Sequence, residues 1–123
     1  MAANTYEELE AWRLSDELKR EVYALIAKMP ARNDFRFCNQ IRESAASAPR
    51  NLAEGFGRFR PASFALFVEI AIGSAMETQV SLKDGIDRGY FTADDVQRAS
   101  ELALRTIKVS TKLLLYLKRC QKR

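Results

Sequence analysis

Hydrophobic residues recur along most of the chain at the three- and four-residue spacing of amphipathic helices. The pattern occupies four segments, which are residues 6–28, 34–56, 61–88 and 92–122. No segment alternates with the two-residue period of a half-buried strand. The pattern therefore predicts an all-α fold in which one domain, residues 1–123, forms an up-down-up-down four-helix bundle with short connections.

Short local motifs predict where these helices begin. Thr5 and Glu8 have the spacing of a capping box, in which a hydroxyl and a carboxylate satisfy the first N–H groups of a helix. Thr92 and Asp95 have the same spacing at the fourth segment. Pro61 stands at the start of the third segment, and proline is favoured at the first position of a helix.

The third segment is apolar on two opposite sides. Between residues 61 and 82 the only charged side chains are Glu69 and Glu77. One side of the helix should face the bundle core, and the opposite side carries Leu66, Ile70, Met76 and Val80. A four-helix bundle cannot enclose one of its own helices, so a helix that is apolar nearly all round predicts a homo-oligomer whose interface includes these four residues. The alternative is that they are scattered surface residues, which are common.

Small residues gather at two places in the chain. Gly73, Ser74 and Ala75 lie together on the third segment, and residues 44–48 (SAASA) lie on the second. Glycine inside a helix is unfavourable by about 1 kcal/mol relative to alanine, so it needs a structural reason. We expect both stretches to let helix backbones approach closely.

The N-terminus carries Glu7, Glu8 and Glu10, where a secretory signal would need basic and then apolar residues. The most apolar stretch, residues 64–76, is short for a membrane span and is interrupted by Glu69. We therefore expect a cytoplasmic protein with no membrane partner. Cys38 and Cys120 allow one disulfide, but reduced thiols are the expectation in that compartment.

Positive charge is concentrated near the C-terminus. The whole chain carries a net charge of +4, of which residues 92–123 contribute +5 and the rest −1. A basic stripe along one side of the fourth helix predicts a nucleic-acid-binding surface for RNA or DNA, formed by Arg98, Arg105, Lys108, Lys112, Arg119 and Lys122. The alternative is an ordinary solvated face, because Glu101 lies within the stripe and no aromatic residue in it offers a stacking platform.

Residues that carry chemistry are scarce. The chain has no histidine, which removes the commonest general base and the commonest metal ligand. It also has no CxxC pair and no phosphate-binding glycine loop of the GxxxxGK[ST] form. We expect no enzymatic activity, no cofactor and no metal site, although an all-carboxylate site formed by Glu54, Glu69 and Glu77 is an alternative.

Asn51, Glu54 and Arg58 stand out on the second segment. Glu54 and Arg58 are four residues apart and have the spacing of a helical ion pair. If that pair lies partly within the bundle, we expect it to specify the packing of the second helix against its neighbours. A cluster that recognises a ligand is the alternative.

Several stretches resemble the motifs of a known family. They are residues 6–12 (YEELEAW), 40–42 (QIR), 47–58 (SAPRNLAEGFGR) and 70–77 (IAIGSAME), the last preceded by Phe64 and Phe67. Together they are similar to the 23S rRNA intervening-sequence protein family, with Ala48 and Leu52 as departures from its commoner pattern. The resemblance makes Asn51, Glu54, Gly55 and Arg58 a structural family signature.

The resemblance also carries implications for assembly and function. It implies a four-helix bundle that assembles as a ring-shaped homopentamer. The same similarity extends to the accessory proteins of diversity-generating retroelements, which bind nucleic acid and a reverse transcriptase. For the family at large it implies no established biochemical activity. Two interpretations follow: a ring that binds nucleic acid, or a protein-interaction scaffold with no nucleic-acid role and an unknown protein partner.

Overall fold

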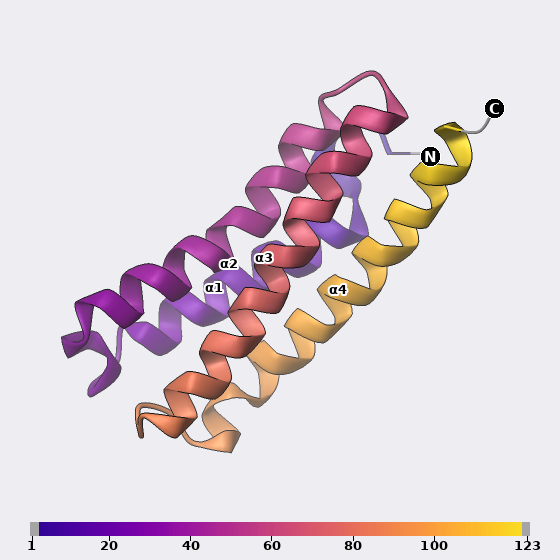
Figure 1. Cartoon of the computed structure of the whole chain (residues 1–123). Helices are drawn as coiled ribbons and strands as arrows, with labels where there is room; N and C mark the ends of the chain where they lie inside the picture. The colour runs from indigo at the N-terminus through magenta and orange to yellow at the C-terminus, as the bar shows by residue number, and fades with distance from the viewer. Residues whose placement is uncertain (1–2, 122–123) are drawn as a thin grey trace.

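The computed structural model describes residues 3–121 and shows four long helices packed alongside one another (Figure 1). Single turns of 3-10 helix precede the first and second of them. In chain order the elements are η1 (Tyr6–Glu8), α1 (Glu10–Ile26), η2 (Ala31–Asn33), α2 (Phe35–Phe56), α3 (Pro61–Asp87) and α4 (Ala93–Gln121). Residues 3–121 contain no strand, which confirms the all-helical prediction for this part of the chain.

The first helix begins later than the sequence predicts. Residues 6–8 form only η1, Leu9 is extended (φ −71°, ψ 125°), and α1 starts at Glu10. The Glu8 carboxylate accepts hydrogen bonds from the backbone N–H groups of Asn4 (2.6 Å) and Thr5 (2.9 Å), so it serves a single turn. The extended backbone at Leu9 brings this side chain into the core, where it is buried.

The second helix follows the prediction closely. Asp34 stands just before α2, and its Oδ1 accepts a hydrogen bond from the N–H of Phe37 at 3.0 Å, as an N-cap residue does. The helix continues through Pro49, whose side chain is buried, and ends at Phe56. The apolar residues before and after Pro49 thus belong to one continuous helix.

Nearby residues also account for where α3 begins, for the turn that follows it and for where α4 begins. Pro61 is the first residue of α3, and Gly89 in the following connection has a left-handed backbone (φ +79°) that favours glycine. The Thr92 N–H donates to Asp95 Oδ2 at 2.8 Å, and the Asp95 N–H donates to Thr92 Oγ1 at 3.1 Å. This reciprocal pair confirms the predicted cap. The hydrogen bond from the Thr92 N–H is the largest cause of the lowered pKa of the Asp95 carboxyl.

Each long helix packs mainly against two others, since α1 and α3 both contact α2 and α4. The buried apolar side chains form two groups, one around Leu18 and Ile41 and the other around Leu52 and Val68. Hydroxyl groups lie between these groups along α2 and α3, where Ser44 Oγ and Thr78 Oγ1 share a hydrogen bond of 2.9 Å. The arrangement leaves one side of every helix at the surface, including the outer sides of α3 and α4.

Candidate functional site

The outer side of α3 is apolar and exposed. Phe64, Val68 and Ala75 are buried on the side of α3 that faces the other helices. The predicted interface residues occupy the other side and are between 49% and 69% exposed, namely Leu66, Ile70, Met76 and Val80. The two-sided pattern is therefore present in the folded chain, while the contact with another subunit stays a prediction.

Ser74 and Gly73 are neighbouring small residues of α3 that have different surroundings. Ser74 is buried, and its Oγ lies 2.7 Å from Ser47 Oγ on α2, so this pair brings the two helices close together. Gly73 instead points outward, and a Cβ placed on it would meet nothing within 4 Å. The expectation of close backbone approach at Gly73 is wrong within the single chain, because the residue lies on the exposed side of the helix.

The length of α3 corrects one expectation. The sequence predicts that residues 64–76 are too short a stretch to cross a membrane, but α3 has 27 residues and its most apolar window has a mean hydropathy of 1.2. Among the described residues it is the one helix that is long and apolar enough to do so, and 39% of that window is buried. Length and composition alone are weak evidence for a span, because the core helix of a soluble bundle meets the same criterion.

The central part of the predicted basic stripe lies open on α4. Arg105, Lys108, Lys112 and Arg119 are all exposed, and we call these four residues the α4 basic surface. No ion pair within residues 3–121 engages any of them. Between residues 98 and 121 of α4, the exposed Glu101 is the one acidic residue, so positive charge predominates on this side of the helix.

Arg98 differs from the other stripe residues because it is bound to the neighbouring helix. Its guanidinium lies 3.4 Å from the Glu17 carboxylate and 3.7 Å from the Glu21 carboxylate, both on α1. These pairs place two carboxylates beside its positive charge. Lys122, the last residue predicted for the stripe, lies outside the described residues.

Asn51 of the signature takes part in the contact between α2 and α3. Its Nδ2 donates to the Ser47 carbonyl oxygen at 2.8 Å and to Ser47 Oγ at 3.0 Å. Ser47 Oγ in turn lies 2.7 Å from Ser74 Oγ on α3. Asn51 is thus placed to orient the hydroxyl pair that joins the two helices.

The predicted ion pair between Glu54 and Arg58 is absent from the described part of the chain. Because α2 ends at Phe56, Arg58 no longer follows the helical register that would place it beside Glu54. Its guanidinium lies over the Phe67 ring instead, 4.8 Å from the ring centre. Glu54 is exposed, and buried Gly55 provides the close packing, since its Cβ position is 2.8 Å from atoms of both Phe64 and Phe67.

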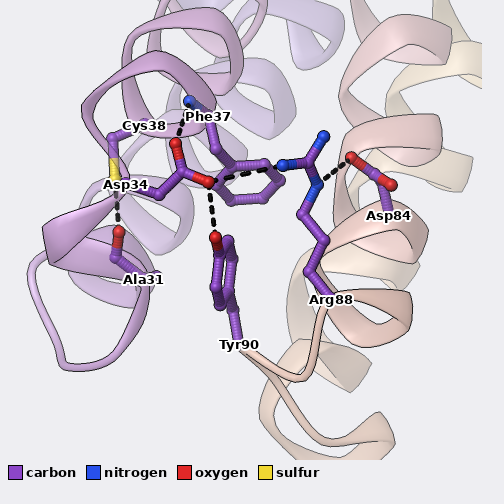
Figure 2. Close-up of polar contacts among 7 residues, drawn as sticks. All are labelled: Ala31, Asp34, Phe37, Cys38, Asp84, Arg88 and Tyr90. Atoms are coloured by element: carbon purple, nitrogen blue, oxygen red, sulfur yellow. Dashed lines mark hydrogen bonds and ion pairs between the residues drawn. The ribbon is translucent and has the colours of Figure 1, made fainter.

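The sequence did not reveal a polar cluster that joins the start of α2 to the connection between α3 and α4 (Figure 2). Asp34 Oδ2 accepts a hydrogen bond from the Tyr90 hydroxyl and lies 3.3 Å from the Arg88 guanidinium. Arg88 also pairs with Asp84 at 2.7 Å and lies over the Phe37 ring, 5.7 Å from its centre. Only the Asp84–Arg88 spacing of four residues is visible in the sequence.

The electrostatics of this cluster follow from the hydrogen bond between Tyr90 and Asp34. That bond is the largest cause of the lowered pKa of the Asp34 carboxyl, and the Phe37 N–H adds to it. The same bond raises the pKa of the Tyr90 hydroxyl. The cluster therefore favours a charged Asp34 carboxylate beside a neutral Tyr90 phenol. Their hydrogen bond joins the connection before α2 to the connection after α3.

Groups that bind metals do not gather in the described chain. Residues 3–121 contain no set of three or more histidine, cysteine, aspartate or glutamate side chains placed to hold a metal ion. Cys38 is buried, and its Sγ lies 3.1 Å from the Ala31 carbonyl oxygen, where burial raises the pKa of the thiol. Cys38 and Cys120 are both free cysteines.

Four long helices packed against one another, with exposed apolar and basic sides, define a small all-helical protein of the four-helix-bundle class. The family model described as "23S rRNA-intervening sequence protein" matches residues 7–112. The chain belongs to this family, which is not a known enzyme family. No curated protein matches the chain.

Proposed function

We propose that this protein is a non-enzymatic homo-oligomer that binds RNA or DNA through the α4 basic surface. The observation that carries the proposal is the row of exposed cations Arg105, Lys108, Lys112 and Arg119, which no carboxylate within residues 3–121 neutralises by a direct ion pair. A row of cations along one side of a helix can follow a phosphate backbone. Such contacts release counterions and carry no sequence information, so the binding is independent of sequence.

The homo-oligomer is proposed from the exposed outer side of α3. Leu66, Ile70, Met76 and Val80 would leave water if a second subunit covered them, and burial of apolar surface is worth about 25 cal/mol per Å². The resemblance to ring-shaped relatives favours five subunits, each an up-down-up-down bundle. Repetition of the α4 basic surface around a ring would add weak contacts into a stronger one.

The protein acts in the cytoplasm, away from membranes, with no cofactor and no metal. A protein-interaction scaffold is the second candidate, because the exposed apolar side of α3 suits a protein partner as well as another subunit. Recovery of the tagged protein from cells with and without nuclease separates the two functions. Partners that remain after nuclease treatment support the scaffold.

The direct test of nucleic-acid binding is fluorescence anisotropy with labelled RNA and DNA over a series of salt concentrations. We expect binding at low salt that weakens steeply as salt rises. The combined variant Arg105→Ala, Lys108→Ala, Lys112→Ala should flatten the slope of log affinity against log salt by about three units.

A control with the same loss of charge is available at other surfaces. Arg32, Arg36 and Lys83 are also exposed, lie outside α4 and take part in no ion pair within the described chain. Their combined replacement by alanine should leave the slope nearly unchanged. No binding by the unmodified protein at low salt and micromolar concentration would refute the proposal, as would equal effects of the two triple variants.

A further inference from the structure

The connection between α2 and α3 presents a fully exposed aromatic ring. Residues 57–60 join the two helices, and Phe59 within them is 102% exposed, the highest value among the large apolar side chains of the described chain. Scattered apolar residues are common on protein surfaces. A whole phenyl ring that packs against nothing in its own chain is nevertheless available for contact with a partner.

The charge around this ring is positive. Arg58 and Arg60 flank Phe59 directly, both are exposed, and no carboxylate within residues 3–121 forms an ion pair with either. The first turn of α3, which follows at once, contains no acidic residue. Phe59 therefore has a cationic residue on each side in sequence, with the Arg58 guanidinium over the Phe67 ring and Arg60 exposed with no carboxylate partner in the described chain.

The C-terminal end of α4, to which Arg119 belongs, lies at the same end of the bundle as residues 57–60 (Figure 1). The Lys118 ammonium on α4 lies 3.9 Å from the Glu69 carboxylate, about two turns into α3. This pair brings the C-terminal end of α4 alongside the start of α3. A strand that follows α4 toward Arg119 would thus approach the end of the molecule that carries Phe59.

An exposed aromatic residue that is flanked in sequence by two arginines matches the chemistry of a single nucleic-acid strand. In such a strand each base lies between two phosphates, and an unpaired base can stack on an aromatic ring while arginines contact the phosphates. In a duplex the bases are stacked inside, and a ring at the tip of a loop cannot reach their faces without unstacking them. An exposed ring at this position would therefore favour single strands over duplexes.

We propose that residues 57–60 form a base-stacking point for single-stranded nucleic acid, with Phe59 as the stacking ring and Arg58 and Arg60 as phosphate contacts. This inference rests on the proposed nucleic-acid binding and adds the class of strand that is bound. Stacking involves the π-face that every base has, so the preference concerns strandedness and not sequence.

The test compares oligo(dT) and oligo(U) with a duplex of the same length by fluorescence anisotropy at low salt. Phe59→Ala should weaken single-strand binding by about five-fold or more and leave duplex binding within about two-fold of the unmodified protein. Phe59→Trp should keep single-strand affinity, because indole also stacks on bases. Phe59→Leu should behave like Phe59→Ala, because leucine keeps apolar bulk but has no ring.

A matched control is Phe35→Ala. Phe35 is 77% exposed at the first position of α2, but it is flanked by Asp34 and Arg36, whose charges cancel. Its removal should change neither affinity. Arg60→Gln should flatten the salt dependence of single-strand binding by about one unit.

Four outcomes would overturn the inference. They are single-strand affinity unchanged in Phe59→Ala, equal losses of single-strand and duplex affinity in that variant, full affinity in Phe59→Leu, and a change of oligomeric state in Phe59→Ala by light scattering. Binding of the unmodified protein to phosphatidylserine-containing vesicles that Phe59→Ala abolishes, without any effect on oligonucleotides, would assign the loop to a membrane surface instead.

The same data separate this inference from the proposed function. If the unmodified protein binds neither single strands nor duplex, both fail. If it binds both forms, the α4 triple variant loses both, and Phe59→Ala changes nothing, the proposed function stands and the stacking point fails. If Phe59 alone governs single-strand affinity, the stacking point stands and the α4 basic surface fails.

Discussion

Asp34 joins distant parts of the chain through several polar contacts. It caps α2 through the N–H of Phe37, and it binds Tyr90 and Arg88 from the connection between α3 and α4 (Figure 2). Tyr90 lies 56 residues away in sequence, so the hydrogen bond joins two loops that the helices alone would not hold together. Asp34 therefore links the start of one helix to the end of another.

The pKa shift at Asp34 predicts how stability depends on pH. The folded chain holds the Asp34 pKa below the unfolded value of about 3.9, chiefly through the hydrogen bond from Tyr90. The contribution of the carboxylate is therefore present above about pH 4 and is lost as pH falls through the folded pKa. Asp34→Asn keeps a good capping residue but removes the charge, so it should lower the free energy of unfolding at pH 7 and lose its effect toward pH 3.

Urea denaturation of both proteins between pH 3 and pH 7 measures this difference. Glu43→Gln is the matched control, because Glu43 is an exposed carboxylate on α2 with no ion pair in the described chain. A difference between Asp34→Asn and the unmodified protein that stays constant with pH would contradict the prediction. The raised pKa of Tyr90 adds a loss of stability at the alkaline end, above about pH 10.

At the scale of the element, two glycines in helices have opposite surroundings. Gly55 on α2 faces Phe64 and Phe67 of α3, while Gly73 on α3 faces open space. Each would gain about 1 kcal/mol of helix propensity on replacement by alanine. Of these two positions, Gly55 is the one where a Cβ would collide with neighbours, at 2.8 Å, and one of the two atoms is the Phe67 Cβ, which cannot swing away.

These surroundings predict opposite effects of the same substitution. Gly55→Ala should lower stability, since overpacking typically destabilises by about 1–3 kcal/mol, whereas Gly73→Ala should raise the stability of the folded chain by about 1 kcal/mol. Thermal unfolding of the two variants side by side measures the difference. A midpoint for Gly55→Ala at or above that of Gly73→Ala would show that the α2–α3 contact is looser than the distances indicate.

For the whole molecule, the proposed assembly depends on the outer side of α3. Ile70→Glu would place an unpaired charge in the proposed interface, which is strongly unfavourable in a buried setting. We expect this variant to dissociate toward the 14.0 kDa chain, and the unmodified protein to have a mass five times larger. Light scattering after size exclusion measures both masses.

A control for this experiment lies on the neighbouring helix. Leu104 on α4 is 47% exposed, close to the 51% of Ile70, but lies outside the proposed interface. Leu104→Glu should leave the mass of the assembly unchanged. A monomeric unmodified protein at micromolar concentration would refute the assembly, and a dimer or trimer would refute the number five.

The sequence by itself determined the four helices, most of their ends and the two-sided character of α3. These features depend on residues within a few positions of one another, as in the cap at Thr92, the proline that begins α3 and the apolar period of α3. The same local patterns located the exposed cations of α4.

Only the tertiary structure decided which polar side chains meet. Arg98 pairs with Glu17 and Glu21, which lie 81 and 77 residues away in sequence. Arg58 lies over the Phe67 ring and does not form the predicted ion pair with Glu54. The tertiary structure also replaced the predicted first turns of α1 with η1 and an extended Leu9 that buries its side chain. Contacts of this kind depend on how the helices pack. The local period of a sequence records which side of a helix is apolar, but not which residue of another helix lies opposite.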